Sequence, residues 1–119
     1  MTAKLNHTIA EVRDKRRSAT FMTEILGLPA PVVFGPFLCV QLGNDVTLDF
    51  ADASAELHPQ HYAFLISEAE FDEVFARITS RGLPYWADPA RRHPGQINTR
   101  DGARRLYFEE PGGHLLEIL

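Results

Sequence analysis

Residues 61–84 read HYAFLISEAEFDEVFARITSRGLP and contain one complete strand–helix unit. The opening run, His61 to Ile66, predicts a strand. Ser67 and Glu70 then stand three positions apart, as in a capping box, in which each side chain bonds the other residue's free backbone N–H. Apolar residues at helical spacing follow, namely Phe71, Val74, Phe75 and Ile78. The spacing predicts a helix that buries one face, and Gly82 is placed to end it in a left-handed conformation.

The same order of signals occurs earlier in the chain. A strand is predicted over residues 5–12, after which Asp14 is placed to cap a helix and Gly27 to end it. Gly27 and Gly82 lie 55 positions apart, and the histidines that open the two strands lie 54 positions apart. Self-similarity at a fixed spacing indicates an internal repeat.

Each copy ends in a predicted hairpin. The strands are predicted at 37–42 and 46–51 around the turn 43–45, and at 106–109 and 114–119 around the turn 110–113. The chain therefore reads as two copies of a strand–helix–strands unit. One covers about residues 4–52 and the other about residues 60–119, within a single domain spanning residues 1–119.

Composition limits the class of protein. The chain has 119 residues, 45% of them hydrophobic, and a net charge of -4. It lacks an apolar run long enough for a membrane span and the apolar core of a signal peptide, so we expect a cytoplasmic protein without membrane contact. An acidic balance argues against nucleic acid and favours a small-molecule partner. The single cysteine, Cys39, lies in an apolar run and is interpreted as a buried packing residue.

The second copy contains a long insertion at residues 86–105. A loop of this length inside a compact domain is more often functional or mobile than idle. Its arginines include Arg92 and Arg105, which are candidates to bind an anionic group on a substrate if the loop forms a lid. Candidate aromatic contacts are Tyr85, Trp86 and Tyr107. The alternative is a solvated loop whose charges only aid solubility.

Each copy also carries a histidine at the start of its first strand and a carboxylate in its last. These are His7 with Asp49, and His61 with Glu117. Glu117 lies among leucines and isoleucine, where an ionised carboxylate is costly to bury unless a cation or strong donors compensate it. Imidazole and carboxylate are common ligands of Zn, Fe, Mn and Ni. Asp49 is also compatible with the wet face of an edge strand, and the other histidines, His58, His93 and His114, are interpreted as solvent-exposed or as outer neighbours of a site.

Three stretches resemble the vicinal oxygen chelate superfamily, which includes glyoxalase I, extradiol dioxygenases, fosfomycin-resistance transferases and bleomycin resistance proteins. They are residues 5–7 (LNH), 61–69 (HYAFLISEA) and 110–117 (EPGGHLLE). The resemblance implies an α+β fold of two tandem βαβββ modules whose curved mixed sheets form a cup around a metal. It also implies a homodimer, and a cup built within one chain and a cup shared by two chains both remain open.

By this resemblance, His7, His61 and Glu117 match the family's metal ligands. Asp49 falls where glyoxalase I has a glutamate, so Asp49 is a possible fourth ligand or catalytic base. The chain departs from the fosfomycin enzymes at Ile9, where they have threonine, and at Pro59, where they have tyrosine.

Two functions follow as hypotheses. The first is a glyoxalase-like or dioxygenase-like enzyme with one divalent ion (Zn, Ni, Mn or Fe), whose small substrate chelates the metal through oxygen atoms. The second is a non-catalytic protein that binds a small molecule, such as a drug, in the manner of bleomycin resistance proteins.

Overall fold

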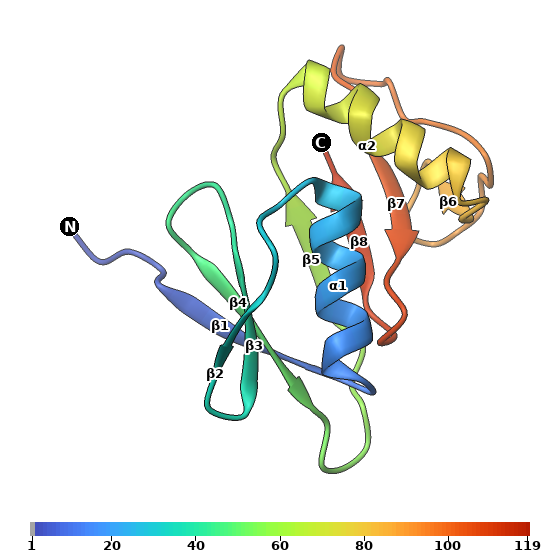
Figure 1. Ribbon diagram of the computed structural model, residues 1–119. Helices are drawn as coiled ribbons and strands as arrows, with labels where there is room; N and C mark the ends of the chain where they lie inside the picture. Colours follow the sequence, from blue (N-terminus) through green and yellow to red (C-terminus); the bar gives the residue numbers. More distant parts are fainter. Residues whose placement is uncertain (1) are drawn as a thin grey trace. The chain divides into compact units, whose positions relative to one another are not determined.

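The computed structural model describes residues 2–119. The chain divides into two compact units, Met1–His58 and Pro59–Leu119. Each unit is a βαβββ module with one mixed four-stranded sheet, which confirms the predicted α+β class (Figure 1). The interpretation of both units as one domain stays a prediction.

The first unit contains one helix and four strands. Their bounds are β1 His7–Val12, α1 Lys15–Leu26, β2 Val32–Phe34, β3 Phe37–Gln41 and β4 Thr47–Asp52. The sheet order is β1-β4-β3-β2, in which β1 pairs with β4 in parallel and the other pairs are antiparallel. Strand β4 is therefore an inner strand.

The caps of α1 are those that the sequence predicts. Asp14 accepts hydrogen bonds from the backbone N–H groups of Arg16 and Arg17, which have no partner inside the helix. Gly27 ends the helix with φ 69°, a left-handed conformation that costs glycine little. The apolar residues of α1 and of one face of the sheet form the core of this unit, among them Met22, Ile25, Val40 and Phe50.

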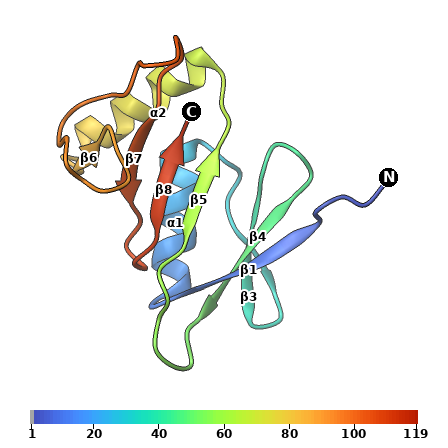
Figure 2. The ribbon, with the colours of Figure 1, turned by 180° about the vertical axis from the view of Figure 1, so that it is seen from behind.

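The second unit repeats the arrangement. Its elements are β5 His61–Phe64, α2 Glu68–Ser80, β6 Tyr85–Trp86, β7 Leu106–Glu109 and β8 Leu115–Ile118. The sheet order is β5-β8-β7-β6, again with one parallel pair, β5 with β8 (Figure 2). The capping box of Ser67 and Glu70 is present, and the apolar stripe of α2 is buried at Phe71, Val74 and Ile78.

Strands β2 and β6 are not among the elements that the sequence predicts. They are edge strands of three and two residues, too short to show an alternating pattern. The remaining strands match the predictions to within two residues at each end, and both predicted hairpins form.

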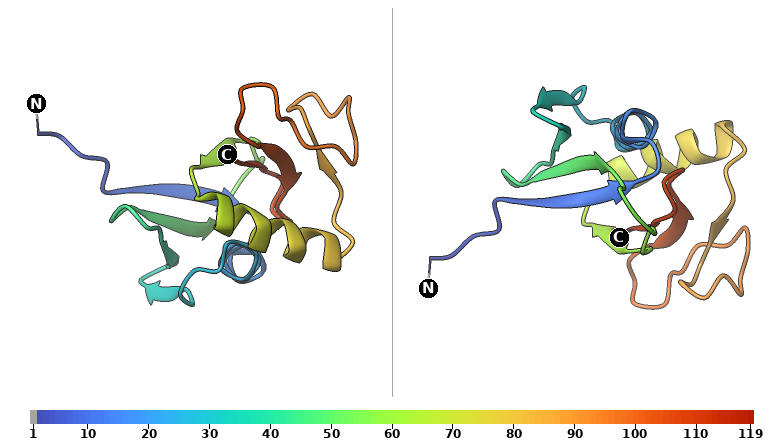
Figure 3. Two further views of the ribbon diagram at one scale, coloured as in Figure 1. Left: turned by 90° about the horizontal axis from the view of Figure 1, so that it is seen from above. Right: turned by 90° about the horizontal axis from the view of Figure 1, so that it is seen from below.

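The segment between β6 and β7, whose course Figure 3 shows, makes several contacts with its own module. Bridges join Trp86 to Pro94 and Asn98 to Arg105. Arg104 binds α2, with one guanidinium nitrogen 2.7 Å from Glu68 Oε2 and another 2.7 Å from Asp72 Oδ1. The predicted long loop is therefore an ordered segment with contacts at both ends, and we call it the excursion between β6 and β7. Within residues 2–119, neither helix has the length and apolarity needed to cross a membrane.

Candidate functional site

The strand register places the two carboxylates at equivalent positions of the two modules. On β4, Asp49 pairs with Ile9 of β1 and Cys39 of β3. On β8, Glu117 pairs with Ala63 of β5 and Tyr107 of β7. Both carboxylates are buried, with exposed fractions of 8% and 6%. The correspondence between the copies thus holds in the folded register as well as in the sequence.

In the second unit, Glu117 contacts two basic side chains. Its Oε1 lies 3.0 Å from His61 Nε2, and its Oε2 lies 3.5 Å from a guanidinium nitrogen of Arg105. The buried carboxylate is therefore compensated by a hydrogen bond and a nearby cation, as its burial requires. The side chain of His61 stays 44% exposed, so small molecules can reach this pair from solvent.

Aromatic side chains extend the same face of the sheet. The ring of Tyr107 lies 5.8 Å from the ring of His61 at a tilt of 58°. Trp86 pairs with Tyr107 across β6 and β7, so both share the face of Glu117. We define the Glu117 face as His61, Trp86, Arg105, Tyr107 and Glu117. The Glu117 face therefore combines a histidine and a carboxylate, which are common metal ligands, with two aromatic rings and one arginine.

Two other predicted substrate contacts lie elsewhere. Tyr85 precedes Trp86 on β6 and so points to the opposite face, where its ring packs edge-on against Phe75 at 5.3 Å. Arg92 is exposed, and its backbone N–H donates to Asp88 at 2.9 Å. A different arginine, Arg91, lies over the Trp86 ring at 5.5 Å.

The pair His61 and Glu117 suits a divalent ion. Two ligands at right angles, each at about 2.1 Å from an ion, lie about 3.0 Å apart, and this equals the separation of His61 Nε2 and Glu117 Oε1, 3.0 Å. Among residues 2–119 there is no group of three or more His, Cys, Asp or Glu side chains arranged to hold an ion. His7 is exposed, and its Nδ1 lies 2.8 Å from the side-chain oxygen of Asn6.

Asp49 is not on a wet edge strand, so that interpretation was wrong. Strand β4 is an inner strand of its sheet, with a neighbouring strand on each side. The Asp49 side chain on this strand is buried. Its Oδ1 is buried without a hydrogen-bond partner. A buried oxygen without a partner costs free energy and often marks a functional group.

Cys39 is partly buried and hydrogen-bonds to Asp49 across the strands. Desolvation, this hydrogen bond and the neighbouring carboxylate raise the pKa of the thiol to about 11. Cys39 is therefore a neutral thiol at physiological pH, consistent with the expectation that it is not a nucleophile.

Sequence reasoning missed Glu110. His114 is 1% exposed and Glu110 is 3% exposed, so of the two interpretations of His114 the solvent-exposed one was wrong, while its place as an outer neighbour of a site stays a prediction. The motif EPGG was interpreted only as a turn, but its glutamate accepts hydrogen bonds from the backbone of Gly112 and His114. The available signal was a carboxylate directly before a Pro-Gly-Gly turn, a place where Asp and Glu often bond nearby N–H groups.

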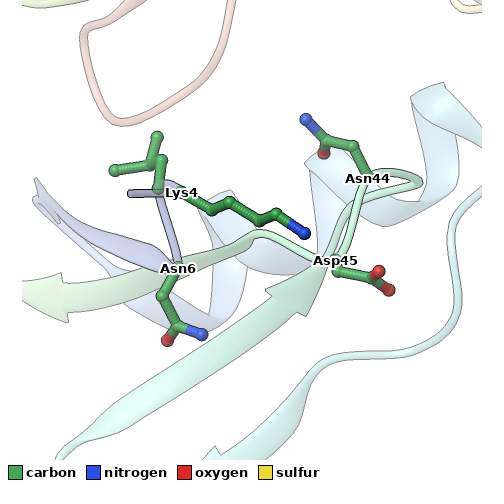
Figure 4. A pocket seen from close by; sticks show the side chains of 5 residues that line it. Lys4, Asn6, Asn44 and Asp45 are labelled. Atoms are coloured by element: carbon green, nitrogen blue, oxygen red, sulfur yellow. The ribbon is translucent and has the colours of Figure 1, made fainter. Parts of the chain in front are cut away.

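A shallow pocket lies in the first unit between the N-terminal segment and the β3–β4 turn (Figure 4). It is lined by Lys4, Leu5, Asn6, Asn44 and Asp45. None of the predicted ligands or substrate contacts lines it, so we assign it no role.

The chain is similar to several known proteins. Among the curated relatives, the chain is 31% identical to "Glutathione transferase FosA" of Serratia marcescens, covering 99% of this chain and 81% of the relative. It is also 26% identical to "Metallothiol transferase FosB" of Shouchella clausii (strain KSM-K16), covering 99% and 80%.

Two solved structures are more similar. "Oxidase ChaP-H1" is 56% identical with a TM-score of 0.96, covering 98% of this chain and 94% of that chain. "Oxidase ChaP-H2" is 53% identical with a TM-score of 0.95, covering 99% and 93%. The sequence matches the profile of one family over residues 4–118, nearly its whole length. The chain therefore belongs to the Glyoxalase/Bleomycin resistance protein/Dioxygenase superfamily.

Proposed function

We propose that the chain is a divalent-metal-dependent oxidase that acts on a small molecule with two neighbouring oxygen atoms. The observation that carries this proposal is the 3.0 Å pair of His61 Nε2 and Glu117 Oε1, on an accessible and otherwise aromatic face. His7, which occupies the place of His61 in the first module, is proposed as the third ligand. The likeness to two chains called oxidases supports oxidation over other reactions of the family, and it favours iron as the metal.

The residues of the Glu117 face have distinct proposed roles. His61 and Glu117 would hold a divalent ion, which would supply Lewis-acid polarisation of the substrate oxygens. Arg105 lies beside Glu117 and attracts an anionic group of the substrate to the same place. The rings of Tyr107 and Trp86 pack against the apolar part of the substrate and exclude water from it.

Asp49 is proposed as a proton acceptor. Its Oδ1 is buried without a hydrogen-bond partner in the protein, and this oxygen is the one that we propose to accept a proton from a substrate hydroxyl. The hydrogen bond to Cys39 orients the carboxylate without neutralising it, because the thiol keeps its own proton at neutral pH.

Metal content tests the ligand assignment. We expect about one divalent ion per chain in protein purified without chelator, measured by elemental analysis. His61→Ala and Glu117→Gln should each lower the bound metal by tenfold or more, since either change removes a ligand. The matched controls are His93→Ala and Glu109→Gln, which alter exposed residues of the same types and should keep the metal. Equal metal content in all four variants would contradict the assignment.

Oxygen uptake tests the reaction. With the metal-loaded protein, an oxygen electrode should record uptake when catechols or α-hydroxyketones are supplied as probes, and Asp49→Asn should slow it at least tenfold. Substrate consumption that requires glutathione and takes up no oxygen would indicate thiol transfer instead, as the name of the Serratia marcescens relative describes. Tight binding of a probe without turnover would support the sequestering alternative.

A further inference from the structure

The turn at residues 110–114 joins β7 to β8, the strand that carries Glu117, and it contains two buried polar side chains, Glu110 and His114. The Glu110 carboxylate accepts a hydrogen bond from Gly112 N at 2.7 Å and another from His114 N at 3.0 Å. The backbone adds a third link, from Glu110 N to His114 O at 3.1 Å. A carboxylate buried to 3% exposure with two backbone donors is held strongly in one place.

This turn reaches the strand that carries His61. The backbone N–H of Gln60 donates to His114 Nδ1 at 2.8 Å, and Leu115 N donates to Gln60 O at 2.9 Å. Both backbone groups of the residue before His61 are therefore bound by two successive residues, 114 and 115. Residue 60 is fixed relative to the strand that holds Glu117.

The chemistry of the Gln60 bond defines the state of the His114 ring. A backbone N–H can only donate, so Nδ1 must be the unprotonated acceptor nitrogen and the ring proton is on Nε2. The ring is 1% exposed and packs edge-on against Tyr62, with centroids 5.5 Å apart. The neighbouring Glu110 charge adds to desolvation in raising the pKa of Tyr62, so this phenol stays neutral in the same pocket.

We propose that His114 and Glu110 are positioning residues that hold His61 at ligand distance from Glu117. Neither side chain is among those proposed to touch the ion or the substrate. His114 acts through Gln60 on the start of β5, and Glu110 acts by fixing the backbone of His114. The inference rests on the proposed metal function only for its readout of metal affinity.

Three substitutions at residue 114 separate positioning from simple packing. In His114→Asn the side-chain oxygen can take the place of Nδ1, whereas in His114→Gln the amide lies nearer to Nε2. His114→Leu keeps volume but has no acceptor. We expect His114→Asn to keep manganese and iron affinity within about threefold, and His114→Gln and His114→Leu to lose about tenfold or more, a size common for residues behind metal ligands.

A second readout needs no metal. In the apo protein, the backbone amide of Gln60 should exchange with deuterium slowly in wild type and His114→Asn and at least tenfold faster in the other two variants, measured by NMR. Glu110→Gln keeps one acceptor oxygen in place of two, so the exchange rate of its Gln60 amide should lie between the slow and the fast variants. Calorimetric unfolding of each variant establishes that it is folded.

The outcomes are distinct from those that test the proposed function. If His61→Ala abolishes metal binding while His114→Gln and His114→Leu bind as wild type does, the positioning role is wrong and the function stands. If His114→Asn loses affinity and His114→Gln keeps it, contacts at Nε2 matter instead, and the proposal is also wrong. If His61→Ala keeps the metal, the metal function fails, and the exchange rate of Gln60 still tests the positioning role.

Discussion

Asp49 and Glu117 differ by one methylene group, and they have different partners. Glu117 lies within 3.0 Å of His61 Nε2 and beside Arg105, whereas Asp49 hydrogen-bonds Cys39 and leaves Oδ1 without a partner. The charge of Glu117 is therefore compensated by His61 and Arg105, whereas Asp49 keeps an oxygen lone pair without a hydrogen bond. This difference is the basis for the two roles that we propose, metal ligand for Glu117 and proton acceptor for Asp49.

The thiol of Cys39 reports on the charge of Asp49. With a pKa of about 11, Cys39 should react slowly with iodoacetamide at pH 8, and its rate should rise as the pH approaches 11. In Asp49→Asn the carboxylate no longer raises the pKa, so we expect alkylation at pH 8 to be at least threefold faster. Mass spectrometry of the alkylated chain measures the rate, and Cys39→Ser provides the blank. Identical rates in wild type and Asp49→Asn would contradict the interaction.

The raised pKa of Cys39 also affects how the free energy of unfolding depends on pH. Well below pH 9 the thiol is neutral in both folded and unfolded chains, so it makes no pH-dependent contribution there. Between the ordinary pKa of 9.0 and the folded value of about 11, only the unfolded chain loses the proton, so the free energy of unfolding falls as the pH rises. Denaturant unfolding of wild type from pH 8 to 11 should show this extra fall relative to Cys39→Ser.

Some of the site residues could be predicted from the sequence, and others could not. The repeat predicts that His61 and Glu117 belong to one module, at places equivalent to His7 and Asp49. Their contact depends on the pairing of β5 with β8, which is a tertiary property. Tyr85 and Trp86 could not both face the site, since neighbours on a strand point to opposite sides. Which of them does so depends on how β6 pairs with β7, and no periodic signal in a two-residue strand reveals that.

Helices were easier to predict than edge strands. Both helices carry their own start and stop signals, Asp14 with Gly27 and Ser67 with Gly82, and both begin and end within two residues of them. Strand β2 reads VVF with all three residues exposed, so it has no buried face to impose alternation. Its place is determined by pairing with β3, which is a tertiary property.

Arg104 connects the excursion between β6 and β7 to α2, and its removal should loosen that segment. The guanidinium bonds Glu68 and Asp72 and lies 4.4 Å from the ring centre of Phe71. We expect Arg104→Ala to lower the midpoint of denaturant unfolding only slightly, because the pairs are largely exposed, and to speed tryptic cleavage after Arg91 and Arg92.

The control for this prediction is Arg100→Ala, an exposed arginine of the same excursion for which no side-chain ion pair is found in residues 2–119. It should leave the cleavage rate at the other arginines unchanged. If both variants are cleaved at the wild-type rate, the excursion is ordered by other contacts.

The chain as a whole repeats one βαβββ design twice, and this property was the most predictable from sequence. The family's assembly was inferred only from resemblance. An edge strand with exposed apolar side chains fits that inference: Val32, Val33 and Phe34 of β2 are 65%, 67% and 74% exposed. Exposed apolar clusters on a strand edge commonly mark an interface between chains.

We therefore expect a homodimer in which β2 is covered. Sedimentation at micromolar concentration should give about twice the chain mass of 13.4 kDa. Phe34→Asp should weaken association by tenfold or more, whereas Thr99→Asp, also exposed but outside any apolar cluster, should not. A monomer in the wild type would contradict the dimer.

Mixing two defective variants shows which chain supplies His7. If His7 and His61 act on one ion from different chains, an equal mixture of His7→Ala and His61→Ala, denatured and refolded together, should recover about a quarter of the wild-type metal sites. If both ligands come from one chain, the mixture should recover none. Elemental analysis of the refolded protein measures the recovery.

The register shared by the two sheets also provides a plan for engineering. Because Cys39 and Asp49 occupy the places of Tyr107 and Glu117, each module is a physical template for editing the other. The double change Cys39→Tyr with Asp49→Glu would place the side-chain pair of the second module in the register of the first. Because His7 and Asp49 of the first module have proposed roles in the activity, loss of turnover in this variant would show that the two halves have diverged and are no longer interchangeable.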